Sequence, residues 1–144
     1  MPRTLCLIAS GLSACAVPPN PPVSREIVWI DAQTEALARR ACYDCHSNET
    51  EWQAIHRLPL LNSIVEGDVA RGRCHMNFSA WDGPNEEAAE AVEVLLDGEM
   101  PLPSYTLAHP RARLDDEEIV QLIEGIEATF ATDPPLPGEA CGDD

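Results

Sequence analysis

The segment that most constrains this chain is the pentapeptide Cys42-Tyr43-Asp44-Cys45-His46. Two thiols lie about one helical turn apart, and a histidine follows the second thiol directly. This C-x-x-C-H pattern is the attachment motif of c-type haem, in which both thiols bond to the haem and the histidine becomes the proximal iron ligand. A C-x-x-C pair without the histidine also occurs in redox dithiols and zinc sites. The adjoining His46 therefore favours one covalent haem c, held by Cys42 and Cys45.

Length and charge limit what else the chain can be. It has 144 residues and no internal repeat, which predicts one domain with short appendages. The net charge is −16, and all nine basic residues are arginine. So acidic a surface argues against nucleic acid, or an anionic membrane face, as a binding partner. A redox partner would be expected to present a basic docking face.

The N-terminus is typical of an export signal. Residues 4–12 are mostly apolar, follow Arg3, and are too few to span a bilayer. The sequence LSAC at 12–15 resembles a bacterial lipobox, so we expect removal of residues 1–14 and lipidation of Cys15. The alternative is ordinary cleavage at the small residues around Cys15, which gives a soluble periplasmic protein. Both outcomes place the domain outside the cytoplasm, where haem attachment takes place.

The remaining cysteines and the flanking segments follow from this processing. Cys6 is lost with the signal, which leaves Cys74 and Cys141 either to form a disulfide in an oxidising compartment or to remain separate thiols. Residues 15–33 contain four prolines between positions 18 and 22 and predict a semi-rigid spacer. The haem-binding domain is expected over 34–131, followed by an acidic tail rich in proline and glycine over 132–144.

Apolar periodicity and capping signals predict the helices of the domain. They are expected at residues 34–42, 61–69, 86–97 and from 115 onward. Asn85 is a candidate N-cap of the third helix, and Gly98 is placed to end it. Asp115 and Glu118 have the spacing of a capping box. The rest of 47–85 is expected to be irregular, because it contains prolines and glycines.

Four stretches of the sequence carry a resemblance to a known family. They are 42–50 (CYDCHSNET) with Trp52; 68–69 and 72–73 with 77–81 (NFSAW); 98–101 (GEMP) with Tyr105 and His109-Pro110; and 114–118 (LDDEE). The order of helix, haem motif, loops, helix, Met-Pro loop and last helix resembles a class I cytochrome c. Together the stretches resemble the bacterial haem-binding domain family of small exported c-type haem proteins, over about residues 35 to 130. The resemblance implies an all-α, cytochrome c-like fold, with three to five short helices and ordered loops around one covalent haem. It departs at 53–55 (QAI), where the family has further aromatic residues.

Met100 is the expected sixth ligand of the iron. A thioether is a soft ligand that raises the reduction potential relative to a second histidine. The flanking Gly98 and Pro101 form a loop able to present it. Met76 is the rival and is interpreted as a core residue, while His75 is a weaker candidate ligand. His109 is expected to hydrogen-bond within its own loop.

Other residues are predicted to surround the haem. In class I cytochromes a proline carbonyl accepts the second N–H of the proximal histidine, and Pro59 is placed to do so here or to serve only as a turn residue. Trp52, Trp81 and Tyr105 are expected to pack on or near the ring. Arginines that could neutralise the propionates are Arg71, Arg73, Arg111 and Arg113.

These residues favour a mono-haem electron carrier over an enzyme, with His46 and Met100 on the iron. The alternative is a haem sensor or peroxidase-like enzyme with an open sixth site. Its acid–base group would have to be chosen from His56, His75 and His109. A third possibility is a zinc-binding interaction module that uses Cys42, Cys45, Cys74 and His75.

Overall fold

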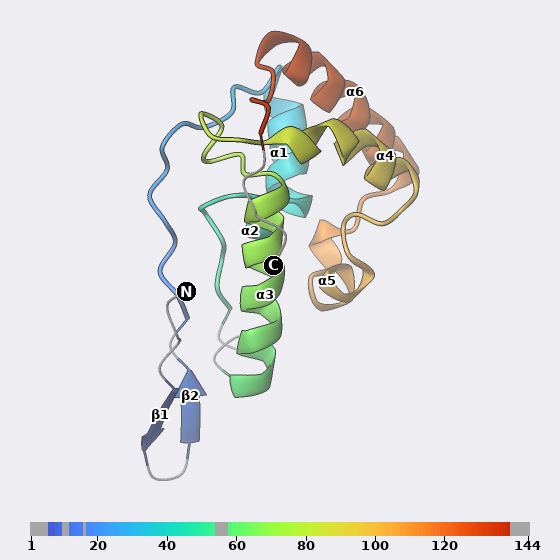
Figure 1. The fold of residues 1–144 in the computed structure, drawn as a ribbon. Helices are drawn as coiled ribbons and strands as arrows, with labels where there is room; N and C mark the ends of the chain where they lie inside the picture. The colour runs from blue at the N-terminus through green and yellow to red at the C-terminus, as the bar shows by residue number, and fades with distance from the viewer. Residues whose placement is uncertain (1–5, 10–11, 16, 54–57, 139–144) are drawn as a thin grey trace.

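The computed structural model describes residues 6–9, 12–15, 17–53 and 58–138 (Figure 1). Its elements in chain order are β1 (Cys6–Ala9), β2 (Leu12–Cys15), α1 (Ala32–Ala41), α2 (Tyr43–His46), α3 (Pro59–His75), the 3₁₀ turn η2 (Glu86–Glu90), α4 (Ala91–Leu96), α5 (Pro103–Ala108), η3 (Pro110–Ala112) and α6 (Asp116–Thr132). Apart from the β1–β2 hairpin, the described residues form no sheet. The predicted all-α fold is confirmed, with six α-helices among the described residues where three to five were expected.

The hairpin lies within the segment predicted to be an export signal. β1 and β2 pair antiparallel, with Cys6 opposite Cys15, and β2 contacts α3. Residues 1–5, 10–11 and 16 lie outside the described residues, and removal of the signal stays a prediction. None of the described helices has the length and apolar character needed to cross a membrane.

Helices α1 and α6 pack against each other, and side-chain caps define where each begins. Asp31 caps α1 by accepting the backbone N–H of Thr34 at 2.7 Å. Asp115 and Glu118 form the predicted capping box of α6. A β-carbon on Gly125 of α6 would collide with the Thr34 side chain, so glycine permits the close approach of the two helices.

The hydrophobic core lies between α1, α4, α6 and the loop after α3. Trp81, Phe78 and Leu122 are its largest fully buried apolar side chains. The ring of Phe78 lies 5.3 Å from that of Tyr43 and 6.2 Å from that of Trp81, so one aromatic group connects the haem motif to the centre of the core. Trp81, predicted to pack on the haem, is instead a core residue.

The domain extends beyond the predicted limits of 34–131. Ile27, within the expected spacer, is 3 % exposed and belongs to the core. At the other end, the carbonyl of Asp133 accepts the indole N–H of Trp81 at 3.1 Å, and the carbonyl of Leu136 accepts the N–H of Asn85 at 2.9 Å. The first part of the predicted tail is therefore tied to the domain, while 139–144, with Cys141, lies outside the described residues.

Helix α3 is the largest departure from the predicted secondary structure. A short helix over 61–69 was expected, but α3 runs from Pro59 to His75. Gly67 and Gly72 weaken the helical signal in the sequence, since glycine costs a helix about 1 kcal/mol relative to alanine. Packing against α2 overrides that weak propensity.

The predicted helix over 86–97 is divided into η2 and α4. Asn85 makes no side-chain cap. Its side chain instead accepts the N–H of Asn77 at 2.7 Å and donates to the carbonyls of Ala80 and Gly83, which holds the preceding loop together. Gly98 ends the segment as predicted, with φ of 71°.

Candidate haem site

The haem motif sits where α1 ends. The N–H of Cys42 still bonds to the carbonyl of Ala38 at 2.8 Å, and α2 follows directly with Cys45 and His46. Both thiols are free and partly exposed. Helix α3 approaches this turn closely, because a β-carbon on Gly72 would lie 2.6 Å from the carbonyl oxygen of Cys45. The motif is thus positioned by α1 behind it and by α3 beside it.

Two adjoining cavities of about 310 and 190 Å³ open onto the motif. The residues that line both are Ala41, Cys42, His46, His75, Met100 and Pro101. The larger cavity is otherwise mainly apolar, with walls from α1, α4 and α6; the smaller one adds Cys45 and Tyr105. We call the two together the haem cleft. An apolar cleft with a few convergent ligating groups is the usual form of a cofactor site.

His46 is half-buried and is oriented by a backbone acceptor. Its Nδ1 lies 3.1 Å from the carbonyl oxygen of Met76. A carbonyl can only accept, so Nδ1 carries the proton and Nε2 is left for a metal. Burial lowers the pKa of His46, and the Met76 carbonyl partly opposes that shift. The imidazole is therefore neutral, as an iron ligand must be.

The two thiols are held in their protonated form. Burial, followed by the neighbouring Cys45, raises the pKa of Cys42 to about 12. Burial, with Asp44 and Asp68 nearby, raises the pKa of Cys45 to about 11. A redox dithiol requires a thiol whose pKa is lowered, so these raised pKa values disfavour that interpretation of the C-x-x-C pair.

Two methionines reach the cleft, and they approach it from different elements. Met100 lines both cavities from the loop between α4 and α5, whereas Met76 lines only the larger one. Met76 is 9 % exposed and its backbone holds His46. Met76 therefore lies on the same side of the cleft as His46, whereas Met100 lies on another wall.

The aromatic residues predicted near the haem separate in the structure. Tyr105 lines the smaller cavity, and its hydroxyl donates to Asp44 at 2.8 Å. Trp52 lies outside the lining of the cleft, where its indole donates to Asn20 at 3.2 Å. Trp81 does not line the cleft either, because it is buried between Phe78 and Phe130.

Pro59 and Arg73 do not take the predicted places. Pro59 is the first residue of α3, and the acceptor for His46 is the carbonyl of Met76, at the other end of that helix. Arg73 donates to the carbonyl of Ser47 at 2.7 Å and to the hydroxyl of Thr50 at 2.9 Å, so it fastens the loop after the motif. Of the four arginines considered for the propionates, Arg71 alone lines the cleft, and it pairs with Asp68.

Sequence reasoning missed two features of the cleft wall. His75 Nδ1 and the Glu87 carboxylate are within hydrogen-bond distance at its rim, from α3 and η2. Ala38 and Ala41 supply small side chains on the face of α1 towards the cleft. The three-residue spacing of these alanines just before the motif was the available signal, because small residues on one helix face leave room for a flat cofactor.

A zinc site is not assembled from the residues proposed for it. Cys74 is disulfide-bonded, which removes one of the four ligands. Its pairing with Cys141 stays a prediction, because Cys141 lies outside the described residues. In the part of the chain that the structure describes, no three His, Cys, Asp or Glu side chains group in a way that could hold a metal ion.

Comparison with known proteins agrees with the interpretation of the cleft as a haem site. The sequence pattern of the haem-binding domain family matches residues 11–128. The chain belongs to the haem-binding domain family, and it is a haem-binding protein. No curated protein and no solved structure matches it.

The residues of the cleft fit a c-type haem. Two free thiols and a neutral histidine open into one apolar space, and a thioether reaches the same space from another wall. Cys42 and Cys45 would hold the porphyrin edge, and His46 would hold the iron.

Proposed function

We propose that the protein carries one covalent haem c and transfers single electrons outside the cytoplasm, with His46 and Met100 as axial ligands. The observation that carries the proposal is the convergence of Cys42, Cys45, His46 and Met100 on one cleft. A bound haem supplies an iron that alternates between the ferrous and ferric states. The chain's own residues attach the cofactor, orient its ligands and exclude water.

Attachment by the two thiols needs no oxidant. Cys42 and Cys45 would each add an S–H across one vinyl group of the haem, with sulfur on one vinyl carbon and hydrogen on the other. The thiol spacing matches this task, and neither thiol is engaged elsewhere. The hydrogen bond from His46 to Met76 fixes the tautomer of the proximal ligand, as neighbouring acceptors do in other metal sites.

The assignment of Met100 rests on its position in the cleft. It is half-buried, packs against the core and lines both cavities. A thioether supports low-spin iron in both oxidation states, which suits a carrier that must change little between them. Met76 is less suited, because its backbone is already engaged on the side of His46.

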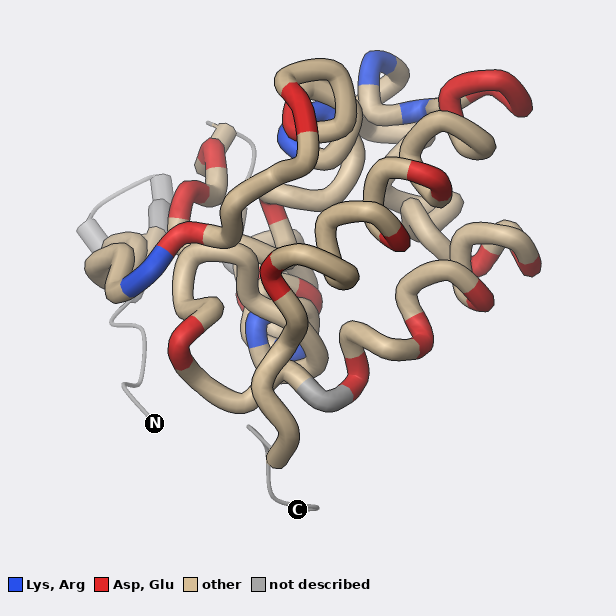
Figure 2. Tube along the Cα trace, turned by 90° about the horizontal axis from the view of Figure 1, so that it is seen from above, with Lys and Arg blue, Asp and Glu red and all other residues tan. Residues whose placement is uncertain are grey.

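The partner and location belong to the same proposal. Acidic residues are spread over most of the fold, whereas basic ones are few (Figure 2). A redox partner with a basic docking face would be drawn to such a surface. We infer that the domain is held at the periplasmic side of a bacterial membrane through lipidated Cys15, and that it has no contact with nucleic acid. A soluble periplasmic form is the alternative.

Covalent attachment is tested by denaturing the mature protein in acid–organic solvent. Haem should stay with the polypeptide in the wild type and be lost in Cys42→Ala/Cys45→Ala. His109→Ala is a control that should retain its haem like the wild type, because His109 does not line the haem cleft. Haem that extracts cleanly from the wild type would refute the proposal.

The sixth ligand is tested by spectroscopy of the two methionine variants. A His/Met pair gives a weak sulfur-to-iron charge-transfer band in the far red for ferric protein. Met100→Ala should abolish the band, lower the potential and open a site for carbon monoxide. Met76→Ala should retain it. If Met76→Ala loses the band and Met100→Ala retains it, the sixth ligand is Met76.

One observation favours a second candidate, a peroxidase-like enzyme or sensor. The His75–Glu87 pair at the rim of the cleft resembles a carboxylate-supported acid–base group. This function requires an open sixth site. Wild-type protein that is high-spin, binds carbon monoxide and loses peroxidase turnover in His75→Ala would establish it in place of electron transfer.

A further inference from the structure

The loop that carries Met100 is attached differently at its two ends. Upstream, backbone bonds hold it to α4: the N–H groups of Glu99 and Met100 donate to the carbonyl of Val94 at 2.9 and 3.1 Å. Gly98 makes this possible, because its φ of 71° turns the chain back on the helix. The upstream end is therefore fixed by the fold of α4 itself.

The downstream end continues into α5, which is poorly anchored. None of the residues of α5 is buried, and its main contacts are with the short turn η3. Tyr105 is one of its half-buried residues, and its hydroxyl donates to Asp44 Oδ2 at 2.8 Å. This bond joins α5 to α2 across 61 positions of the chain.

Other contacts orient both Asp44 and Tyr105 for this hydrogen bond. The other oxygen of Asp44 accepts the N–H of Glu51 at 2.9 Å, which fixes the carboxylate. The ring of Tyr105 stacks on that of His109 at 4.3 Å, with 22° between the planes. Burial, and then the bond to Asp44, raises the pKa of Tyr105 well above its usual range, so the hydroxyl stays a donor.

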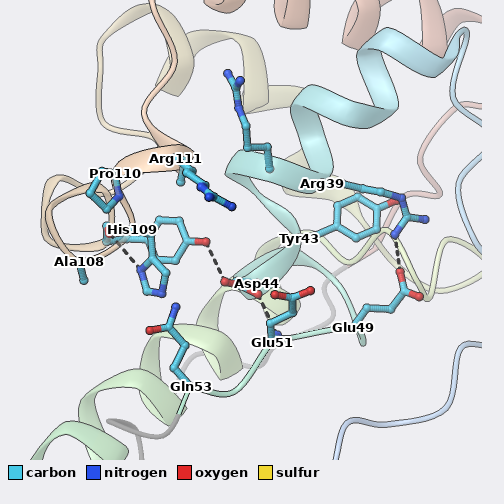
Figure 3. Close-up of a pocket in the computed structure, with 13 residues that line it drawn as sticks. Arg39, Tyr43, Asp44, Glu49, Glu51, Gln53, Ala108, His109, Pro110 and Arg111 are labelled. Carbon is cyan, nitrogen blue, oxygen red and sulfur yellow. Dashed lines mark hydrogen bonds and ion pairs between the residues drawn. The ribbon is translucent and has the colours of Figure 1, made fainter.

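The bond also lies between two cavities. Tyr105 lines the smaller haem cavity and, on the other side, a polar cavity of about 850 Å³. Figure 3 shows this polar cavity with Asp44 and His109 in its wall. Asp44 belongs to the haem motif itself. One pentapeptide thus carries the thiols, the proximal histidine and the anchor for the loop opposite.

We propose that the Tyr105–Asp44 hydrogen bond is a latch that keeps Met100 on the iron, with Tyr105 and Asp44 as positioning residues. The inference rests on the proposed His/Met ligation. Without the latch, α5 is free to move away, and the loop can swing Met100 out of the cleft about its fixed upstream end. An added ligand then competes more easily for the sixth position.

The test is the affinity of the ferric holoprotein for imidazole, which must displace Met100 in order to bind. A half-exposed hydrogen bond to a carboxylate contributes at the lower end of its range, so Tyr105→Phe should bind imidazole about tenfold more tightly. Its far-red band should weaken at a lower imidazole concentration. Asp44→Ala should tighten imidazole binding at least as much, because it also removes the bond from the N–H of Glu51. The double variant should bind imidazole no more tightly than Asp44→Ala, because the Tyr105–Asp44 bond is already absent there.

Tyr43→Phe is the matched control. Its hydroxyl also donates to a carboxylate, that of Glu26 at 2.6 Å, but Tyr43 does not line the haem cleft. This variant should lower the unfolding midpoint without tightening imidazole binding. Asp44→Asn keeps an acceptor for the Tyr105 hydroxyl, so its imidazole affinity should stay close to that of the wild type.

The outcomes separate the latch from the function on which it rests. Wild-type protein without the far-red band refutes His/Met ligation, and the latch with it. A wild type that has the band, together with unchanged imidazole affinity in Tyr105→Phe, refutes the latch alone. Equal tightening in Tyr105→Phe and Tyr43→Phe also refutes it, since the effect would then be general loosening.

Discussion

Replacing Gly72 with alanine tests whether α3 is pressed against the haem motif. An added β-carbon would lie 2.6 Å from the carbonyl oxygen and 2.9 Å from the β-carbon of Cys45. The carbonyl carbon of Cys45 would also lie 2.9 Å away, and the two carbonyl atoms are backbone and cannot rotate away. Relief requires α3 and α2 to separate, and overpacking of this kind costs about 1–3 kcal/mol.

Gly67 provides a control in the same helix. A β-carbon there would meet only the end of the Arg71 side chain, at 3.5 Å, which is an ordinary contact. Alanine in a helix interior gains about 1 kcal/mol over glycine, and this gain is common to both variants. The two variants should therefore differ by the overpacking cost alone, which corresponds to about 4–12 °C in melting temperature for a chain of this size.

Thermal unfolding of the holoproteins, followed by circular dichroism, measures this difference. Gly67→Ala should melt above the wild type, and Gly72→Ala below Gly67→Ala by the stated margin. The yield of covalent haem should also fall in Gly72→Ala, because its extra methyl group displaces Cys45. If both variants are stabilised equally, α3 is not in contact with the motif and the arrangement of the cleft is wrong.

Three further predictions concern caps and processing. Hydrogen bonds from Thr34, first from its backbone N–H and then from its side chain, are the main causes of the lowered pKa of Asp31. Asp31 therefore stabilises the fold above its unfolded pKa of 3.8 and loses that effect as the pH falls through its lower folded pKa. Urea midpoints at pH 5 and pH 3 should differ less in Asp31→Asn than in the wild type, and an equal loss in both would contradict the assignment. Asp115→Ala removes the capping box of α6 and should lower the free energy of unfolding by about 1 kcal/mol, or the melting temperature by about 4 °C. An unchanged melting curve would mean that the cap contributes nothing to stability. Cys15→Ser should release the protein from the membrane fraction, and mass spectrometry should find acyl chains on Cys15 of the wild type; a soluble wild type without acyl mass supports ordinary cleavage.

Local signals in the sequence predicted the parts of the structure that depend on neighbouring residues. The capping box of α6 and the end of the α4 segment at Gly98 are set by side chains within a few positions of each other. The pentapeptide likewise contains most of the site. These features need no knowledge of distant packing, which is why one sequence was enough to find them.

Features that depend on packing were missed. The length of α3 was underestimated because Gly72 was interpreted as a helix breaker, whereas it is the residue that allows contact with α2. Trp81 was predicted to pack on the haem because it is aromatic, yet it is buried in the core between Phe78 and Phe130. The acceptor for His46 was sought at Pro59, because only the tertiary structure reveals that the far end of α3 returns to the motif.

That return has a consequence for His46, the proposed iron ligand. The side chain of His46 donates to the carbonyl of Met76, and its own carbonyl accepts the N–H of Phe78 at 2.8 Å. Both partners lie thirty or more positions along the chain, so a peptide that contains only the motif has a histidine with an undefined tautomer. Docking of α3 therefore fixes the tautomer of His46 that leaves Nε2 available to a metal. Metal binding by the motif should accordingly depend on folding of the rest of the domain.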